Sequence, residues 1–268
     1  MSGLDQPARG RYPVDPGVAG AAMPRRARGR RVLCRAVRLM LALIAILAVG
    51  AATIMLATPS VGNAWSLAGA QARSHHAAFP GPPVPARFAA ALISTEDHRF
   101  ASEPGFDPFA LWRVTLSAIT GQDQGGATLY QQLAKLLYGP HKGRLTVELY
   151  EVALGVKLKF SYTREQILRM YADVAYFGHG YYGLTAASCG YFGRQPARLS
   201  WPQSAVLAGL VQAPSAYDPL EHPDLARSRE GHVMSRLVAT GALTAHRAAA
   251  ALAVPIDRLL APARGCRA

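Results

Sequence analysis

The sequence predicts a mainly α-helical globular domain carried on a single membrane-spanning helix. Nineteen uncharged residues, Leu39 to Ala57, directly follow a cluster of arginines. After Ala86 the apolar residues recur at helical spacing, and no convincing run alternates apolar with polar residues. Half of the 268 residues are hydrophobic, so the chain can bury one good core without help from disulfides.

The N-terminal segment is predicted to be a membrane anchor. Residues 1–38 are basic and are expected to form a disordered cytoplasmic tail, because residues 1–24 are rich in Gly, Ala and Pro without periodicity. A helix over residues 39–57 would be roughly 28 Å long, close to the hydrocarbon thickness of a bilayer. Because the arginines lie on one side only, we expect the N-terminus in the cytoplasm and the rest of the chain outside. A cleaved signal peptide, which would also export the chain, and a buried core helix are the alternatives.

The charge distribution argues against a nucleic-acid-binding module. The net charge is +13. Residues 1–65 hold nine arginines against Asp5 and Asp15, so more than half of the excess lies in and next to the predicted anchor. The sequence also lacks the nucleophile, zinc and nucleotide motifs G-x-S-x-G, H-E-x-x-H and the Walker lysine loop.

Local signals predict the elements of the exported part. Residues 58–85 contain five prolines and are predicted to form a stalk before a domain over residues 86–268. Thr163 to Gln166 and Ser200 to Gln203 fit capping boxes that begin helices. Gly178 to Gly183 matches G-x-G-x-x-G but follows a helical segment, so a tight turn is predicted there. The residues Leu145, Leu149, Val152 and Val156 recur at helical spacing and are predicted to face the core. Of the three cysteines, at most Cys189 and Cys266 can pair with each other.

Polar residues cluster at places that apolar packing does not explain. Glu96 and Asp97 end an apolar helical run, where an unpaired buried carboxylate would be costly, and a salt bridge with Arg99 is the structural alternative. Arg144, Glu148 and Glu151 follow one another at helical spacing. A salt bridge between Arg144 and Glu148 on one helix is the structural explanation. The functional explanation is a binding site in which this cation and this carboxylate lie side by side at the edge of the core.

A third cluster is the polar stripe of an amphipathic helix. It begins after Gly125 and Gly126 and consists of Thr128, Gln131, Gln132 and Lys135. The free N–H groups of a helix N-terminus, together with a lysine and two carboxamides, suit a phosphate. A solvated helix face explains the same stripe.

In this order the clusters resemble the motifs of glycosyltransferase family 51, found in monofunctional peptidoglycan transglycosylases and in bifunctional penicillin-binding proteins. The resemblance runs from about Val84 to Pro255. The residues that carry it are Glu96-Asp97-x-x-Phe100, Gly125 to Thr128 with Gln131-Gln132-x-x-Lys135, Arg144 with Glu148, Ile167-Leu168-x-x-Tyr171, Tyr176 to Gly183 and Gln212 to Pro219.

The resemblance implies a lysozyme-like bilobal domain that polymerises lipid II by inverting glycosyl transfer and releases undecaprenyl diphosphate. Glu96 would be the general base, and Glu148 a second catalytic residue near the diphosphate. The implied substrate-binding residues are Asp97, Phe100, Gly126, Thr128, Gln131, Gln132, Lys135 and Arg144.

The resemblance leaves a Mg²⁺ or Mn²⁺ ion open, assigns no metal ligands and implies no organic cofactor. The expected partners are lipid II, lipid-linked glycan, the membrane, and penicillin-binding or other cell-wall synthesis proteins. The expected location is the bacterial cytoplasmic (inner) membrane, with the catalytic domain on its periplasmic side.

Several positions depart from the family pattern. Each lost donor near a phosphate would cost about 1–3 kcal/mol if it bonded to a charge. A catalytically weak scaffold that binds lipid II or a synthase is therefore one alternative function. A glycan-cleaving hydrolase is the other, because a lysozyme-like fold can host either reaction. The departures are Glu103 for histidine, Ala127 for serine, Tyr130 for threonine, Leu136 for asparagine, Leu145 for lysine, Lys159 for glutamate and Asp173 for asparagine.

Overall fold

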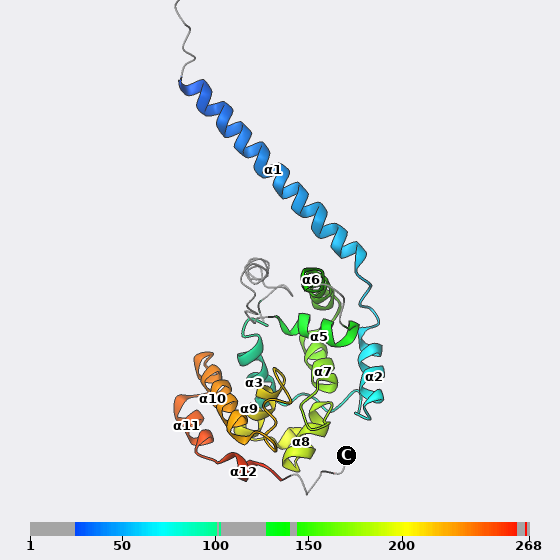
Figure 1. Cartoon of the computed structure of the whole chain (residues 1–268), viewed down its shortest axis with the longest axis vertical. Helices are drawn as coiled ribbons and strands as arrows, with labels where there is room; N and C mark the ends of the chain where they lie inside the picture. The colour runs from blue at the N-terminus through cyan, green and yellow to red at the C-terminus, as the bar shows by residue number, and fades with distance from the viewer. Residues whose placement is uncertain (1–24, 101, 103–126, 140–143, 262–265, 267–268) are drawn as a thin grey trace, which may run out of the picture. The chain divides into compact units, whose positions relative to one another are not determined.

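A computed structural model describes residues 25–100, 102, 127–139, 144–261 and 266 (Figure 1). The chain divides into two compact units, Met1–Ala51 and Ala52–Ala268, which we describe separately. In the described residues the structure is helical, and its β pairing is an isolated bridge between Tyr176 and Tyr182. The predicted mainly α fold is confirmed, and the bilobal lysozyme-like arrangement stays a prediction.

Helix α1 (Arg25–Ala57) contains the predicted membrane span. The part from Leu33 to Ala57 is long and apolar enough to cross a membrane, and no residue of its most apolar stretch is buried against other parts of the protein. The helix already begins at Arg25, so the prediction that residues 25–38 are disordered is wrong. Arginine, alanine and leucine are good helix formers, and the apolar helix can continue backwards through them. Residues 1–24 lie outside the described residues.

The predicted stalk is also wrong, because residues 64–74 form helix α2 (Ala64–Ser74) and pack into the domain. Ala64, Ala68 and Ala72 repeat every fourth residue and are buried. Ahead of the helix, the Lys157 ammonium donates to the carbonyl oxygen of Thr58 at 2.7 Å. The many prolines around this segment obscured a short stripe of small residues.

The other elements form a helical array around one core. Helix α9 packs against both α3 and α10, and every residue from Pro202 to Leu210 is buried (Figure 1). Helix α5 packs on α6 and α7. The bounds are α3 (Ala86–Glu96), α5 (Leu129–Tyr138), α6 (Arg144–Ser161), α7 (Arg164–Val174), α8 (Leu184–Phe192), η1 (Pro196–Arg198), α9 (Trp201–Leu210), α10 (Pro223–Ala239), α11 (Ala245–Leu252) and α12 (Ile256–Leu259).

Helix α6 does not bury the predicted stripe. Its buried apolar side chains are Ala153, Leu154 and Leu158, whereas Leu149, Val152 and Val156 are only half-buried, and the Leu145 side chain lies outside the described residues. The prediction treated the longest apolar row as the core face. The row that packs inward is shorter, and helix α6 packs against α5.

Other local predictions hold. Thr163 and Ser200 accept hydrogen bonds from the backbone N–H groups of Gln166 and Gln203, which complete both capping boxes. The segment from Gly178 to Gly183 is a tight turn in which Gly178, His179, Gly180 and Gly183 have positive φ. The two cysteines left open for pairing, Cys189 and Cys266, form a disulfide that ties the C-terminal segment to α8.

Candidate functional site

The candidate site is built around Glu96, the last residue of α3. Its Oε1 lies 2.9 Å from Nη2 of Arg229 on α10, and its Oε2 accepts a hydrogen bond from Nε2 of Gln132 on α5 at 3.3 Å. The two charged side chains are 13% and 11% exposed, so the ion pair is largely shielded from water. Burial raises the pKa of Glu96, and Arg229 and Gln132 oppose that rise by stabilising the carboxylate.

Gln132 is held so that its amide group faces Glu96. Its Oε1 accepts a hydrogen bond from the Tyr171 hydroxyl at 2.8 Å, and its Nε2 also donates to the backbone oxygen of Ala127 at 3.2 Å. Because a carboxamide has one acceptor end and one donor end, the bond from Tyr171 leaves the donor end for the carboxylate. Burial and the negative charge of Glu96 raise the pKa of Tyr171, which keeps its proton.

Arg229 is the site residue that the sequence analysis missed. Its Nε donates to the carbonyl oxygen of Gly209 at 3.2 Å, and its guanidinium lies 5.7 Å from the ring centre of Tyr217. A Cβ on Gly209 would lie 2.8 Å from the Arg229 side chain, so glycine gives the arginine its room. Helical periodicity could have indicated that Arg229 points inward. Arg229 falls three residues after Ala226 and four before Val233, which both lie on the buried face of α10.

Four of the predicted substrate-binding residues have structural roles. Thr128 and Gln131 form a reciprocal capping box at the start of α5, and both are buried. An Asp97 carboxylate oxygen accepts the backbone N–H of Leu129 at 3.0 Å, which holds the same helix end. Phe100 is buried and stacks on Tyr130 with ring centres 4.9 Å apart. The contacts at the helix end already use the backbone N–H groups of Leu129 and Gln131, which the prediction offered to a phosphate. A substrate-binding role for the four residues stays a prediction.

The predicted diphosphate-binding residues lie one turn further along α5 and on α6. Lys135 is exposed and Glu148 is half-buried. Burial raises the pKa of Glu151, the charge of Lys135 lowers it and the charge of Glu148 raises it again, so the three charges lie close enough to interact. Gln132 and Lys135 share a face of α5 at i and i+3, which connects these charges to Glu96. Gly126 and the side chain of Arg144 lie outside the described residues.

Two departures from the family pattern compensate each other. Tyr130 is fully buried, and the Lys159 ammonium lies 3.4 Å from its hydroxyl and 5.4 Å from its ring centre. A lysine where the family has glutamate therefore partners a tyrosine where it has threonine. Ala127 contributes its backbone oxygen to Gln132, and Leu136 packs against the core. Glu103 and the side chain of Leu145 lie outside the described residues.

A largely buried carboxylate held by a glutamine and an arginine makes Glu96 a candidate acid–base residue. A family model described as Transglycosylase matches residues 66–238. The chain belongs to the transglycosylase family, which confirms the resemblance to glycosyltransferase family 51.

Two relatives found by sequence support the same assignment. Penicillin-binding protein 1A of Streptococcus oralis is 36% identical over 65% of this chain, and a predicted transglycosylase of Cupriavidus necator is 32% identical over 60% of it. This chain spans 28% of the first relative and 70% of the second. A crystal structure of penicillin-binding protein 1A from Haemophilus influenzae matches 35% of this chain and 14% of its own length, with 32% identity and a TM-score of 0.34.

Proposed function

We propose that this protein is a peptidoglycan glycosyltransferase that polymerises lipid II into glycan strands and releases undecaprenyl diphosphate. The observation that carries the proposal is the Glu96 carboxylate, which is 13% exposed and is oriented by Gln132 and Arg229 in a member of the transglycosylase family. Its chemistry is that of a general base.

Glu96 would remove the proton from the 4-hydroxyl group of the acceptor as that oxygen attacks the anomeric carbon of the donor. Burial makes the carboxylate a stronger base than a solvated glutamate, and Arg229 with Gln132 stabilises its ionised form. A positioned general base is typically worth about 10²–10⁴ in rate. Because the attack comes from the face opposite the leaving diphosphate, the anomeric configuration inverts.

The charges on α5 and α6 would receive the leaving diphosphate. Lys135 is exposed and free to approach an anion, and Arg144 lies at the start of α6, one helical turn before Glu148. Glu148 and Glu151 stand three residues apart on one helix and offer the carboxylate oxygens that Mg²⁺ or Mn²⁺ prefers. An ion held by these residues would offset the negative charge that develops on the leaving group.

The location that we propose is the bacterial cytoplasmic membrane, with α1 crossing it once and the domain on the outer side. The arginines of residues 25–38 favour this orientation, because basic residues stay on the cytoplasmic side. The disulfide between Cys189 and Cys266 supports it independently, since structural disulfides persist outside the reducing cytoplasm.

The test is a polymerisation assay with the purified full chain in detergent and labelled lipid II. We expect ladders of glycan products, and we expect Glu96→Gln to abolish them while lipid II still binds. Glu165→Gln is the matched control, because Glu165 is an exposed glutamate in the first turn of α7, and it should leave the ladders unchanged.

Two outcomes would overturn the proposal. Tight lipid II binding by the unaltered protein without any product ladder, under all metal conditions tried, would identify a scaffold. Release of soluble fragments from purified sacculi, with loss of that release in Glu96→Gln, would identify a hydrolase.

A further inference from the structure

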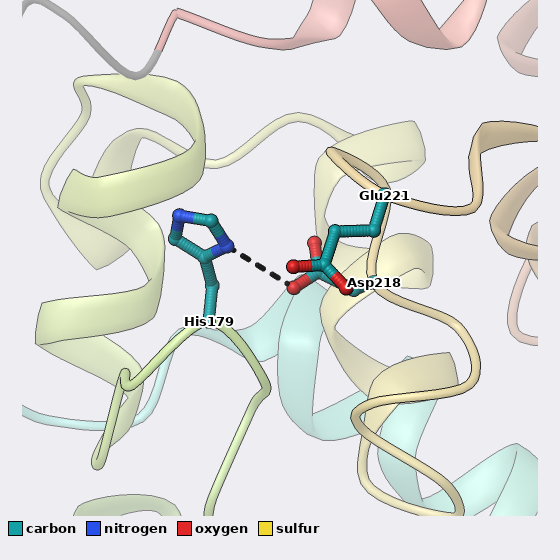
Figure 2. Close-up of side chains that lie close together, drawn as sticks. All are labelled: His179, Asp218 and Glu221. Carbon is teal, nitrogen blue, oxygen red and sulfur yellow. Dashed lines mark ion pairs between the residues drawn. The ribbon is translucent and has the colours of Figure 1, made fainter.

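A second cluster of functional groups joins two loops of the domain and does not include Glu96. His179 lies in the tight turn between Tyr176 and Tyr182, and Asp218 and Glu221 lie in the loop between α9 and α10. Figure 2 shows the imidazole of His179 pointing across to the two carboxylates, which lie side by side. We propose that His179, Asp218 and Glu221 bind a divalent transition-metal ion, with Zn²⁺ as the best match.

The distances suit a shared ion. His179 Nδ1 lies 3.3 Å from Asp218 Oδ2, and the ligand atoms of all three residues lie within 4.8 Å of one another. Zinc takes nitrogen and oxygen ligands at about 2.0–2.2 Å, so two ligands of one tetrahedral ion are roughly 3–4 Å apart. The first pair already has this spacing, and Glu221 is exposed, so no packing against the protein interior restrains its side chain.

The electrostatics favour a cation at this place. Asp218 is only 2% exposed, and a second carboxylate stands beside it. Within the described part of the chain, the side chain that faces its Oδ2 is that of His179, which is 41% exposed. Two carboxylates held close together repel each other, and a divalent ion between them would remove that repulsion.

Asp218 is also fixed as a metal ligand requires. Its Oδ1 accepts the backbone N–H of Leu220 at 3.0 Å, which leaves Oδ2 directed at His179. The pKa of Tyr191 is raised, first by burial and then by the charge of Asp218, so the carboxylate acts on a buried neighbour as well. Such supporting contacts orient the ligands of known metal sites.

The type of ligand selects the ion. One imidazole nitrogen and two carboxylate oxygens resemble the mixed sets that bind zinc at three protein ligands, with water completing the coordination. Mg²⁺ and Ca²⁺ prefer sites made of oxygen alone. Because His179 and Asp218 are 39 residues apart in the sequence, the ion would link the turn to the loop before α10. That loop also carries Tyr217, whose ring lies 5.7 Å from the Arg229 guanidinium. The proposal does not rest on the proposed glycosyl transfer.

Metal binding is measured on the full chain in detergent after treatment with a chelator and dialysis. We expect titration calorimetry to show one Zn²⁺ bound per chain, zinc to raise the melting temperature, and Co²⁺ to give visible absorption bands. Loss of a single supporting contact costs about 10–100-fold in metal affinity, so loss of a direct ligand in His179→Ala should weaken Zn²⁺ binding at least about tenfold.

Three variants make the result specific. Glu221→Gln keeps the side-chain volume at an exposed position, so it should weaken binding even if His179→Ala disturbs the turn. His246→Ala removes an exposed histidine elsewhere and should leave Zn²⁺ binding unchanged. Glu148→Gln removes a carboxylate from the proposed diphosphate site, and it should also leave Zn²⁺ binding at His179 unchanged. The proposal is wrong if the chain binds no Zn²⁺, or if His179→Ala and Glu221→Gln bind it as tightly as the unaltered protein.

Discussion

At the scale of single residues, Arg229 acts against the effect of burial on Glu96. Burial raises the Glu96 pKa and favours the protonated acid, and the guanidinium at 2.9 Å opposes this. A lysine could not replace both of its contacts, because Arg229 also bonds to the carbonyl of Gly209. Arg229 is therefore a positioning residue that acts through Glu96.

Removing Arg229 should shift the pH dependence of the reaction. In Arg229→Gln the pKa of Glu96 rises further, so the acid limb of the activity profile moves to higher pH and activity at pH 7 falls more than activity at pH 9. Initial rates of lipid II polymerisation across this range measure the shift. Arg247→Gln, an exposed arginine on α11, is the control. An equal loss at every pH would show a purely structural role.

Asp173 carries a cost that the common asparagine of the family would avoid. Its carboxylate accepts the backbone N–H of Gly81 at 2.7 Å, and burial still raises its pKa to about 6, against the opposing effects of Gly81 and Arg169. Because the folded pKa lies above the unfolded one, the folded state binds more protons between about pH 4 and 6. Stability therefore falls as the pH rises through this range.

Asp173→Asn should remove this pH dependence. The amide oxygen can still accept from Gly81, and no charge is buried, so the variant should gain melting temperature at pH 8 and gain little at pH 4. Thermal unfolding at the two pH values measures this, with the exposed Asp257→Asn as the control. A larger gain at pH 4 than at pH 8 would contradict the argument.

At the scale of elements, the start of α5 determines where Gln132 lies. The capping box of Thr128 and Gln131 and the carboxylate of Asp97 satisfy the free N–H groups of its first turn. Helix α7 begins with the same kind of box, at Thr163 and Gln166, but that box is exposed. The two helices therefore offer a matched pair of variants.

Thr128→Ala and Thr163→Ala should each lose about 1 kcal/mol of unfolding free energy, because each removes one N-cap. Only Thr128→Ala should also reduce polymerisation, since Gln132 follows it by one turn and bonds to Glu96. Urea unfolding and the glycan assay measure the two effects. Equal activity losses in both variants would show that stability alone limits the rate.

At the scale of the whole molecule, local chemistry was predictable and distant contacts were not. Capping boxes and the acidic end of α3 depend on neighbours within a few residues, and the sequence contains those neighbours. The ion pair of Arg229 with Glu96 joins positions 133 residues apart, so no local pattern predicts it. Helix α2 was missed because its stripe of alanines is short, and α6 was assigned the wrong face because its longest apolar row is not the buried one.

The disulfide between Cys189 and Cys266 is a long-range contact with a large expected effect on stability. It closes a loop over a sequence separation of 77, and the chain-entropy model gives such a loop about 4.5 kcal/mol of stabilisation. Cys189→Ser together with Cys266→Ser should therefore lower the melting temperature, and a reducing agent should do the same to the unaltered protein but not to the double variant. Cys34 is exposed on α1 and unpaired, so Cys34→Ser is the control and should leave melting unchanged. A double variant that melts like the unaltered protein would mean that the helices around α8 hold the C-terminal segment without the covalent link.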